Sequence, residues 1–214
     1  MNEGNASAVE PYLTIMFQPR ATIRRVIETD PRRHVLMLAA VSTALGALQL
    51  AWSSVVSGQY EPGPRWPLSV VGLVVASALA GVLLLYFNAW LVRITGAWLG
   101  GVATSEELRA AIAWPRVPII IASVLSIAGI LAEANGPPPR SMLDLAPWQL
   151  ALSAVAGILD LWGLIAALKC IGEVHGFSAW RAFGAVLLGG LIGLVILGVL
   201  ATVGLILFYA IKPG

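Results

Sequence analysis

Hydrophobic residues fill five long stretches of this chain, and polar residues gather in the short segments between them. A bilayer core of about 30 Å is crossed by about 20 helical residues, whose backbone groups pair within the helix because no water reaches them. The pattern therefore predicts an all-α integral membrane protein with five transmembrane helices in a single bundle. The predicted spans are residues 35–56, 68–91, 117–132, 149–171 and 183–211.

The third stretch leaves the number of spans open. Its sixteen residues make about 24 Å of helix, and Pro118 falls in the first turn, where a missing N–H costs little. Only Ser123 and Ser126 interrupt its apolar character. We expect a short crossing entered at the proline, and a re-entrant segment, which leaves four spans, is the alternative.

The basic residues predict the orientation, because Arg and Lys are retained on the cytoplasmic side of a membrane. With the N-terminus inside and five spans, ten lie inside and three outside, namely Arg65, Arg140 and Lys212. Four spans with a re-entrant third stretch again give ten to three. The charges therefore predict a cytoplasmic N-terminus but do not decide the number of spans.

Residues 1–34 form the predicted cytoplasmic segment, and residues 35–211 the membrane domain. Pro19 can begin a short helix over residues 19–28, with Ile23 on one face and Arg24 on another. This pattern is typical of a helix in the membrane interface whose basic side meets anionic lipid, and an ordinary basic flank is the alternative. The proline-rich loops at residues 58–67 and 133–148 are predicted to be extended.

Helix-capping residues predict where helices begin and end in the cytoplasmic connections. Thr104 and Glu107 have the spacing of a capping box, which predicts a short helix from Ser105 to about Trp114. Between the fourth and fifth spans, a glycine can close one helix in the left-handed conformation and a serine can cap the next. The residues assigned to this cytoplasmic motif are Trp114, Pro115, Pro118, Gly176 and Ser178.

Composition limits the chemistry. Hydrophobic residues make up 58% of the 214 residues and charged residues 11%, which leaves no room for a separate soluble domain. Cys170 is the only cysteine, so neither an intrachain disulfide nor a cysteine-ligated metal site is expected. Glu173 and His175, at a helix end, suggest a surface position rather than a metal site. No phosphate loop or nucleophile with its base is present in the sequence, so we expect no enzyme activity, cofactor, metal or nucleic-acid partner.

One carboxylate, Asp160, stands at the midpoint of the fourth span. An ionised carboxylate there costs roughly 2.5 to 3.5 kcal/mol. Small residues share its helix face and bulky ones, including Trp162, lie opposite, so we expect Asp160 to face neighbouring helices and Trp162 to face lipid. No basic residue lies at matching depth, which favours a neutral or hydrated carboxyl that locks helices together. Its candidate polar neighbours are Ser153, Gln49 and Ser77.

Small residues predict where helices approach closely. Gly157 and Gly163 lie on the fourth span near Asp160, and Gly189 and Gly193 form a small-x-x-x-small stripe on the fifth. Such stripes more often pack helices of one chain together than form the seam of a dimer. The expected partners are the lipid bilayer and, as an alternative use of the stripes, a homodimer or another membrane protein.

Two junctions resemble those of the Ypt-interacting-protein (Yip) family. Residues 107–118 (ELRAAIAWPRVP) are similar to the family's entry into the third span, and residues 173–182 (EVHGFSAWRA) to the junction before the last span in bacterial members. Ala113 and Trp114 replace the more usual glycine and tyrosine, and no clear counterpart of the eukaryotic Asp-Leu-Tyr motif precedes the first span. The resemblance implies a five-helix membrane protein with a cytoplasmic N-terminus and no known catalytic residues. Eukaryotic relatives bind small GTPases during vesicle traffic.

Together these observations predict a scaffold, assembly or membrane-organisation factor of the bacterial inner membrane that acts through helix and lipid contacts. One alternative is a small transporter, channel or lipid-moving protein that uses Asp160. Another is an accessory subunit of a larger membrane complex.

Overall fold

The computed structural model describes residues 11–133 and 146–211. Those residues form helices and short connections, and they contain no strand. Within the described ranges, five helices are long and apolar enough to cross a membrane, which confirms the predicted fold class. The long helices are α3 (Val35–Val56), α4 (Trp66–Trp98), α6 (Arg116–Glu133), α7 (Pro147–His175) and α8 (Ala179–Ile211).

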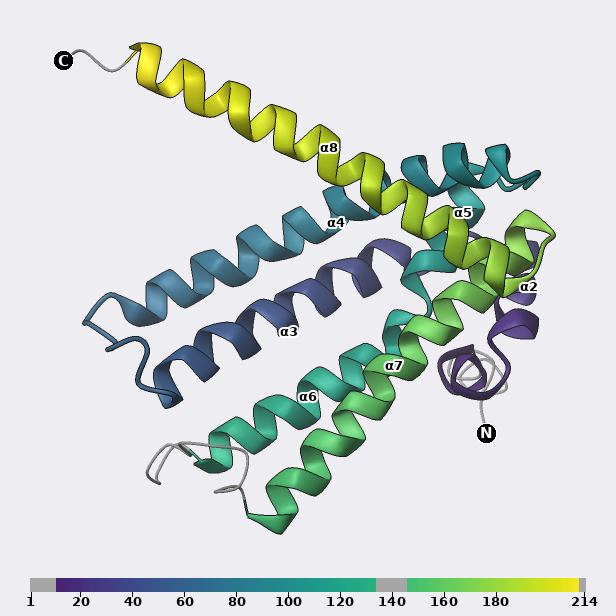
Figure 1. Ribbon diagram of the computed structural model, residues 1–214. Coiled ribbons are helices and arrows are strands. Elements are labelled where there is room, and N and C mark those ends of the chain that lie inside the picture. The colour runs from purple at the N-terminus through teal and green to yellow at the C-terminus, as the bar shows by residue number, and fades with distance from the viewer. Residues whose placement is uncertain (1–10, 134–145, 212–214) are drawn as a thin grey trace.

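The long helices contact one another in a ring. Helix α3 packs on α4, α4 on α8, α8 on α7, α7 on α6, and α6 back on α3. Two short helices lie at one end: α5 (Ser105–Ala113) contacts α3, α4 and α7, and α2 (Pro19–Thr29) contacts α5 and α7. Figure 1 shows the long helices fanning out from this end. We call residues 11–17, α2 and α5 the basal layer.

Many of the most deeply buried side chains belong to the basal layer and its surroundings. Ile15, Ile23, Leu108 and Trp114 are all 0% exposed. Helix α2 begins at Pro19, as the sequence predicts, and its apolar face is buried against α5 and α7. The apolar side of α2 therefore meets protein rather than the membrane interface, because the ends of α5 and α7 lie directly beneath it.

Local capping follows the sequence signals. The Thr104 hydroxyl accepts a hydrogen bond from the Glu107 backbone N–H at 3.3 Å, and the Glu107 carboxylate accepts one from the Thr104 N–H at 2.7 Å. Gly176 has a φ of +75°, and the Ser178 hydroxyl accepts from the Arg181 N–H at 3.4 Å. The capping box, the left-handed helix end and the serine cap are thus confirmed.

Several helices extend past the predicted spans at the basal end. Helix α4 continues to Trp98 rather than stopping at residue 91, and α7 continues to His175 rather than residue 171. A charged side chain marks where an apolar span ends, but backbone hydrogen bonding continues beyond it. Helix α6 has 18 residues, about 27 Å of helix. A turn at Trp114 and Pro115 separates it from α5, and Pro118 lies in its first turn, as predicted.

The half of the bundle away from the basal layer, which we call the far half, is loosely packed. In Figure 1 the C-terminal half of α8 extends away from the other helices, and Leu194 and Phe208 are 69% and 61% exposed. The connection between α3 and α4 is exposed, with the Tyr60 and Trp66 rings 5.0 Å apart. The predicted extended loop at residues 133–148 falls mostly outside the described residues.

Candidate functional site

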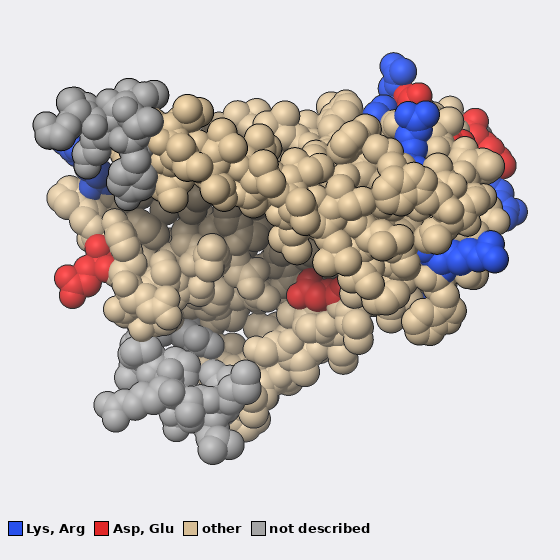
Figure 2. Space-filling model, turned by 45° about the horizontal axis from the view of Figure 1, so that its top comes forward, with Lys and Arg blue, Asp and Glu red and all other residues tan. Residues whose placement is uncertain are grey.

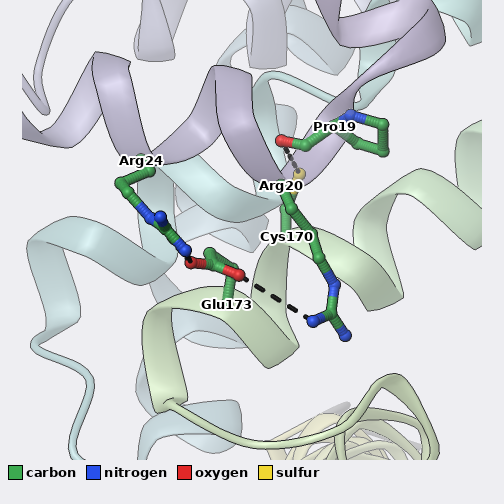
Figure 3. A network of polar contacts seen from close by, with 5 residues as sticks. All are labelled: Pro19, Arg20, Arg24, Cys170 and Glu173. Carbon is green, nitrogen blue, oxygen red and sulfur yellow. Dashed lines mark hydrogen bonds and ion pairs between the residues drawn. The ribbon is translucent and has the colours of Figure 1, made fainter.

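Helix α2 is fixed to α7 by an ion-pair cluster. The Arg24 Nε donates to Glu173 Oε1 at 2.9 Å, and a second guanidinium nitrogen of Arg24 also contacts that oxygen. Arg20 Nη1 lies 3.9 Å from Glu173 Oε2. Figure 3 shows both arginines reaching the same carboxylate from α2. The hydrogen bond to Glu173 and the charge of its carboxylate raise the pKa of Arg24, which stays cationic.

Two further contacts hold the N-terminal segment on α7. The Cys170 thiol donates to the Pro19 carbonyl at 3.5 Å, and the Trp162 indole N–H donates to the Met16 carbonyl at 2.7 Å. Figure 3 shows the Cys170 sulfur beneath Pro19. Lys169 Nζ lies 4.9 Å from the centre of the Trp162 ring. The expectation that Trp162 faces lipid needs correction, because residues 11–17 lie over this part of α7 and accept its N–H.

Trp114 joins the N-terminal segment to α5. Its ring centre lies 5.0 Å from that of Tyr12 and 6.3 Å from that of His34, and the Tyr12 hydroxyl contacts His34 Nδ1. Burial raises the pKa of Tyr12, and the positive charge of Arg33 opposes that rise. Trp114, which the sequence assigns to the cytoplasmic motif, is fully buried because the basal layer encloses it.

His175 occupies a glycine-lined cradle at the end of α7. A Cβ atom added to Gly96 would lie 2.3 Å from Nε2, and one added to Gly101 would lie 2.2 Å from Nδ1. The Ala103 N–H donates to Nδ1 at 3.4 Å, and the Phe177 ring stacks at 4.8 Å. The surface position expected for His175 is wrong: it is 2% exposed. The extended ends of α4 and α7 meet here. The sequence signal that could have shown this contact was the pair of glycines, Gly96 near the end of α4 and Gly101 just after it.

Asp160 has no hydrogen bond or ion pair with any residue in the described ranges, and it is exposed. Ser153 is also exposed and Gln49 is half-buried, while the Ser77 hydroxyl donates to the Val74 carbonyl of its own helix at 2.9 Å. The structure therefore does not assemble the predicted polar lock. The sequence places these residues at similar depths along their helices. However, α7, which carries Asp160, is not adjacent in the ring to α3 or α4, which carry Gln49 and Ser77.

The helix geometry nevertheless indicates what Asp160 faces. One turn further along α7, Leu164 lines a cavity of about 220 Å³, which Asn88 of α4 and Ile112 of α5 also line. Ala167, seven residues after Asp160, lines it as well. Positions four and seven residues apart share a helix face, so Asp160 continues the cavity-lining face outward. Figure 2 shows the tan middle of one face hollowed, with an acidic group beside the hollow.

The predicted packing glycines divide into two groups. A Cβ at Gly163 would lie 2.6 Å from Ile119 Cγ1 of α6, so this glycine permits the close contact of α6 and α7. Gly189 and Gly193 lie against α4, where a Cβ would meet atoms at 3.4 Å and 3.1 Å. Gly157 faces open space, since it lies on the exposed side of α7.

Sequence reasoning missed the role of one half-buried cation. Arg116, at the start of α6, donates to the Ser42 hydroxyl at 2.8 Å and lies 3.5 Å from the Ala39 carbonyl oxygen. It links α6 to α3 at the basal end of the ring. Its position beside two prolines suggested only a flanking charge.

The geometry defines a class: a helical membrane protein whose charged basal layer is fixed under a ring of long apolar helices. The family model of the Yip1 domain matches residues 13–208, which include most of the basal layer, all of α3, α4, α6 and α7, and α8 as far as Phe208. Because this match covers most of the chain, the chain belongs to the Yip family, and it is a multi-pass membrane protein. No curated protein and no solved structure matches it.

Proposed function

We propose that this protein is a non-enzymatic scaffold that organises its membrane surroundings through helix and lipid contacts. The observation that carries the proposal is the fixed position of the N-terminal segment, which Glu173, Cys170 and Trp162 of α7 hold at three points. A segment held in this way presents a surface of constant shape, as a scaffold requires, rather than a free tail.

The surface that the basal layer presents is both basic and apolar. Arg20 and Arg24 have side chains 48% and 65% exposed, and Phe17 is 81% exposed. Most of the blue and red side chains of Figure 2 lie at this end of the molecule. We place this end on the cytoplasmic side of a bacterial inner membrane, since basic residues are retained there.

The test compares two charge reversals in the full-length protein. Glu173→Arg removes the carboxylate that holds Arg20 and Arg24, whereas Glu61→Arg makes the same change in the exposed connection between α3 and α4. Proteins cross-linked in native membranes are identified by mass spectrometry and compared with those from membranes lacking the protein. We expect Glu173→Arg to lose enriched partners that Glu61→Arg retains. If both variants retain the same partners, the fixed basal layer is not the scaffold surface.

A small transporter or lipid-moving protein is the second candidate, and the exposed position of Asp160 beside the cavity of α4, α5, α7 and α8 favours it. In that case Asp160→Asn, which cannot carry a proton, should abolish solute flux or lipid movement in reconstituted vesicles, while Glu61→Gln should not. Equal flux in protein-containing and protein-free vesicles would exclude this candidate. An accessory subunit, the third, would instead co-purify with its complex in fixed stoichiometry in mild detergent.

A further inference from the structure

One side of α7 changes character along its length. Val155 and Ile158 are exposed in the far half of the bundle, as side chains that meet lipid tails are. Trp162 follows on the same side, since residues three and four apart share a helix face. Seven residues further on, the Lys169 ammonium lies 4.9 Å from the centre of the Trp162 ring. Because Trp is enriched at the level of the headgroups and Lys extends toward water, the membrane boundary falls close to Trp162.

The start of α6 places the boundary at the same level. A Cβ atom added to Gly163 would lie 2.6 Å from Ile119 Cγ1 and 3.3 Å from the Pro115 carbonyl oxygen, so Gly163 is level with the first turn of α6. Helix α6 has 18 residues, about 27 Å, and a bilayer core is about 30 Å thick. A helix of this length reaches across the core only if its first turn lies at the boundary. Trp162 immediately precedes Gly163 and therefore lies there too.

Residues 11–17 are the part of the basal layer that reaches this level. The Trp162 indole N–H donates to the Met16 carbonyl at 2.7 Å, whereas α2 meets α7 where Pro19 contacts Cys170. Cys170 lies eight residues nearer the basal end than Trp162, about 12 Å along the helix. In Figure 1 the purple turns that precede α2 are seen nearly along their axis. The segment therefore runs across the long helices, as a helix lying in the membrane plane does.

This helical segment has one buried and one exposed side. Ile15 is fully buried, and Tyr12 and Met16 pack against the same core. Leu13 and Phe17 are four residues apart, share the side opposite Ile15, and are 61% and 81% exposed. Apolar side chains at a membrane boundary gain free energy by entering the hydrocarbon instead of facing water.

We propose that residues 11–17 anchor the basal layer in the membrane interface, with Leu13 and Phe17 inserted among lipid acyl chains next to α7. An amphipathic helix in this position buries its apolar side at the boundary between headgroups and chains. The indole bond to the Met16 carbonyl fixes the depth of the segment relative to α7. The proposal rests on the proposed function and deepens it, because it names a segment through which the scaffold contacts lipid.

The test measures the surroundings of position 17 by spin-label accessibility. The full-length protein is placed in vesicles of phosphatidylcholine and phosphatidylglycerol, and a label is attached to one introduced cysteine, Phe17→Cys, Ile158→Cys or Val102→Cys. Oxygen concentrates among acyl chains and a nickel chelate stays in water, so the two reagents report which medium surrounds the label. Cys170 is fully buried, and the chain without an added cysteine measures any labelling there.

The two reference positions are chosen from the structure. Ile158 is exposed in the far half of α7 and is the lipid reference. Val102 is 81% exposed, the same fraction as Phe17, and is the water reference. Its backbone nitrogen lies 3.4 Å from the His175 carbonyl oxygen, thirteen residues beyond Trp162 toward the basal end.

We expect the label at position 17 to be more accessible to oxygen than to the nickel chelate, as at position 158, and the label at position 102 to show the reverse. Accessibility at position 17 that matches position 102 would overturn the proposal, because the segment would then face water. Low accessibility to both reagents would also overturn it, since a second copy or another protein would then cover this side.

A second measurement needs no label. Leu13→Ser with Phe17→Ser removes the apolar side, and Trp98→Ser with Val102→Ser changes two similarly exposed apolar residues at the basal end. We expect amide hydrogen exchange of residues 12–17 in vesicles to become about tenfold faster or more in the first variant, because burial of two apolar side chains is lost. The control should change it by about twofold or less. Equal exchange in the two variants would contradict the anchor.

Failure of this proposal and failure of the scaffold are distinguishable. Accessibility and exchange are measured on the purified protein in vesicles, whereas the scaffold test counts protein partners in native membranes.

Discussion

The basal layer and the far half of the bundle differ in how deeply they bury apolar side chains. In the basal layer, Ile15, Ile23 and Leu108 are fully buried among other side chains. In the far half, Leu194 and Leu200 of α8 are 69% and 61% exposed, although they are at least as apolar. The first region has water as its neighbour and the second has lipid tails, so only the first gains free energy by burying apolar surface within the protein.

Polar groups differ in the same way between the two regions. At the basal end, arginines pair with carboxylates of other helices: Arg24 of α2 with Glu173 of α7, and Arg32 with Glu106 of α5. In the far half, the hydroxyl groups of Ser53, Ser77 and Thr202 donate to carbonyls of their own helices. Tertiary specificity is therefore concentrated at the basal end, where substitutions should have their largest effects on folding.

Trp114→Ala should have the largest effect. Trp114 is fully buried beside Tyr12 and His34, and removing so large a side chain typically costs about 3 to 5 kcal/mol of unfolding free energy. The control is Trp180→Ala, at an 83% exposed position, which should change stability by about 0.5 kcal/mol or less. Denaturation in detergent micelles measures both. Similar values for the two variants would contradict the assignment of the main core to the basal end.

Gly96→Ala should come next. The added methyl would lie 2.3 Å from His175 Nε2, and overpacking of this kind costs about 1 to 3 kcal/mol. Adding His175→Ala to the same chain should recover part of the loss, since the two sites are in contact. Gly190→Ala, where nothing lies within 4 Å, is the control for a glycine in a long helix. A double variant that is less stable than the sum of its singles would argue against the cradle.

Glu173→Gln should have a smaller effect that depends on salt. The change removes the charge that Arg20 and Arg24 meet, and both arginine side chains are substantially exposed, so solvent already screens the pairs. We expect a lower midpoint of thermal unfolding and faster amide hydrogen exchange in α2, with the difference shrinking as salt is added. The exposed Glu61→Gln is its control. Exchange in α2 that is unchanged would mean that Cys170 and Trp162 alone hold the segment.

Asp160→Leu should have the smallest effect on stability. Asp160 is exposed and has no partner in the described ranges, so its replacement should shift unfolding free energy by about 0.5 kcal/mol or less, or stabilise the protein. The same unfolding measurement gives the result. A loss comparable to that of Gly96→Ala would restore the interpretation of Asp160 as a helix lock.

The features that the sequence predicted correctly depend on residues close together in the chain. Hydrophobic runs predict the long helices because each helix satisfies its own backbone groups. The Thr104 and Glu107 pair and the Gly176 turn involve residues a few positions apart. The surroundings of Asp160, Trp162 and His175 differed from expectation, because each depends on which segment of the chain lies beside that residue. Matching depth along separate spans says nothing of the order of helices in the ring.

The sequence by itself determined the class of this protein, the approximate positions of its long helices, and the caps at their basal ends. These follow from hydrocarbon solvation and from hydrogen bonds within a single segment. Only the tertiary structure decided that α2 packs on α7, that His175 enters the cradle of Gly96 and Gly101, and that Trp162 donates to the Met16 carbonyl. Such pairings join residues far apart in the chain, and their geometry arises only when the helices pack together.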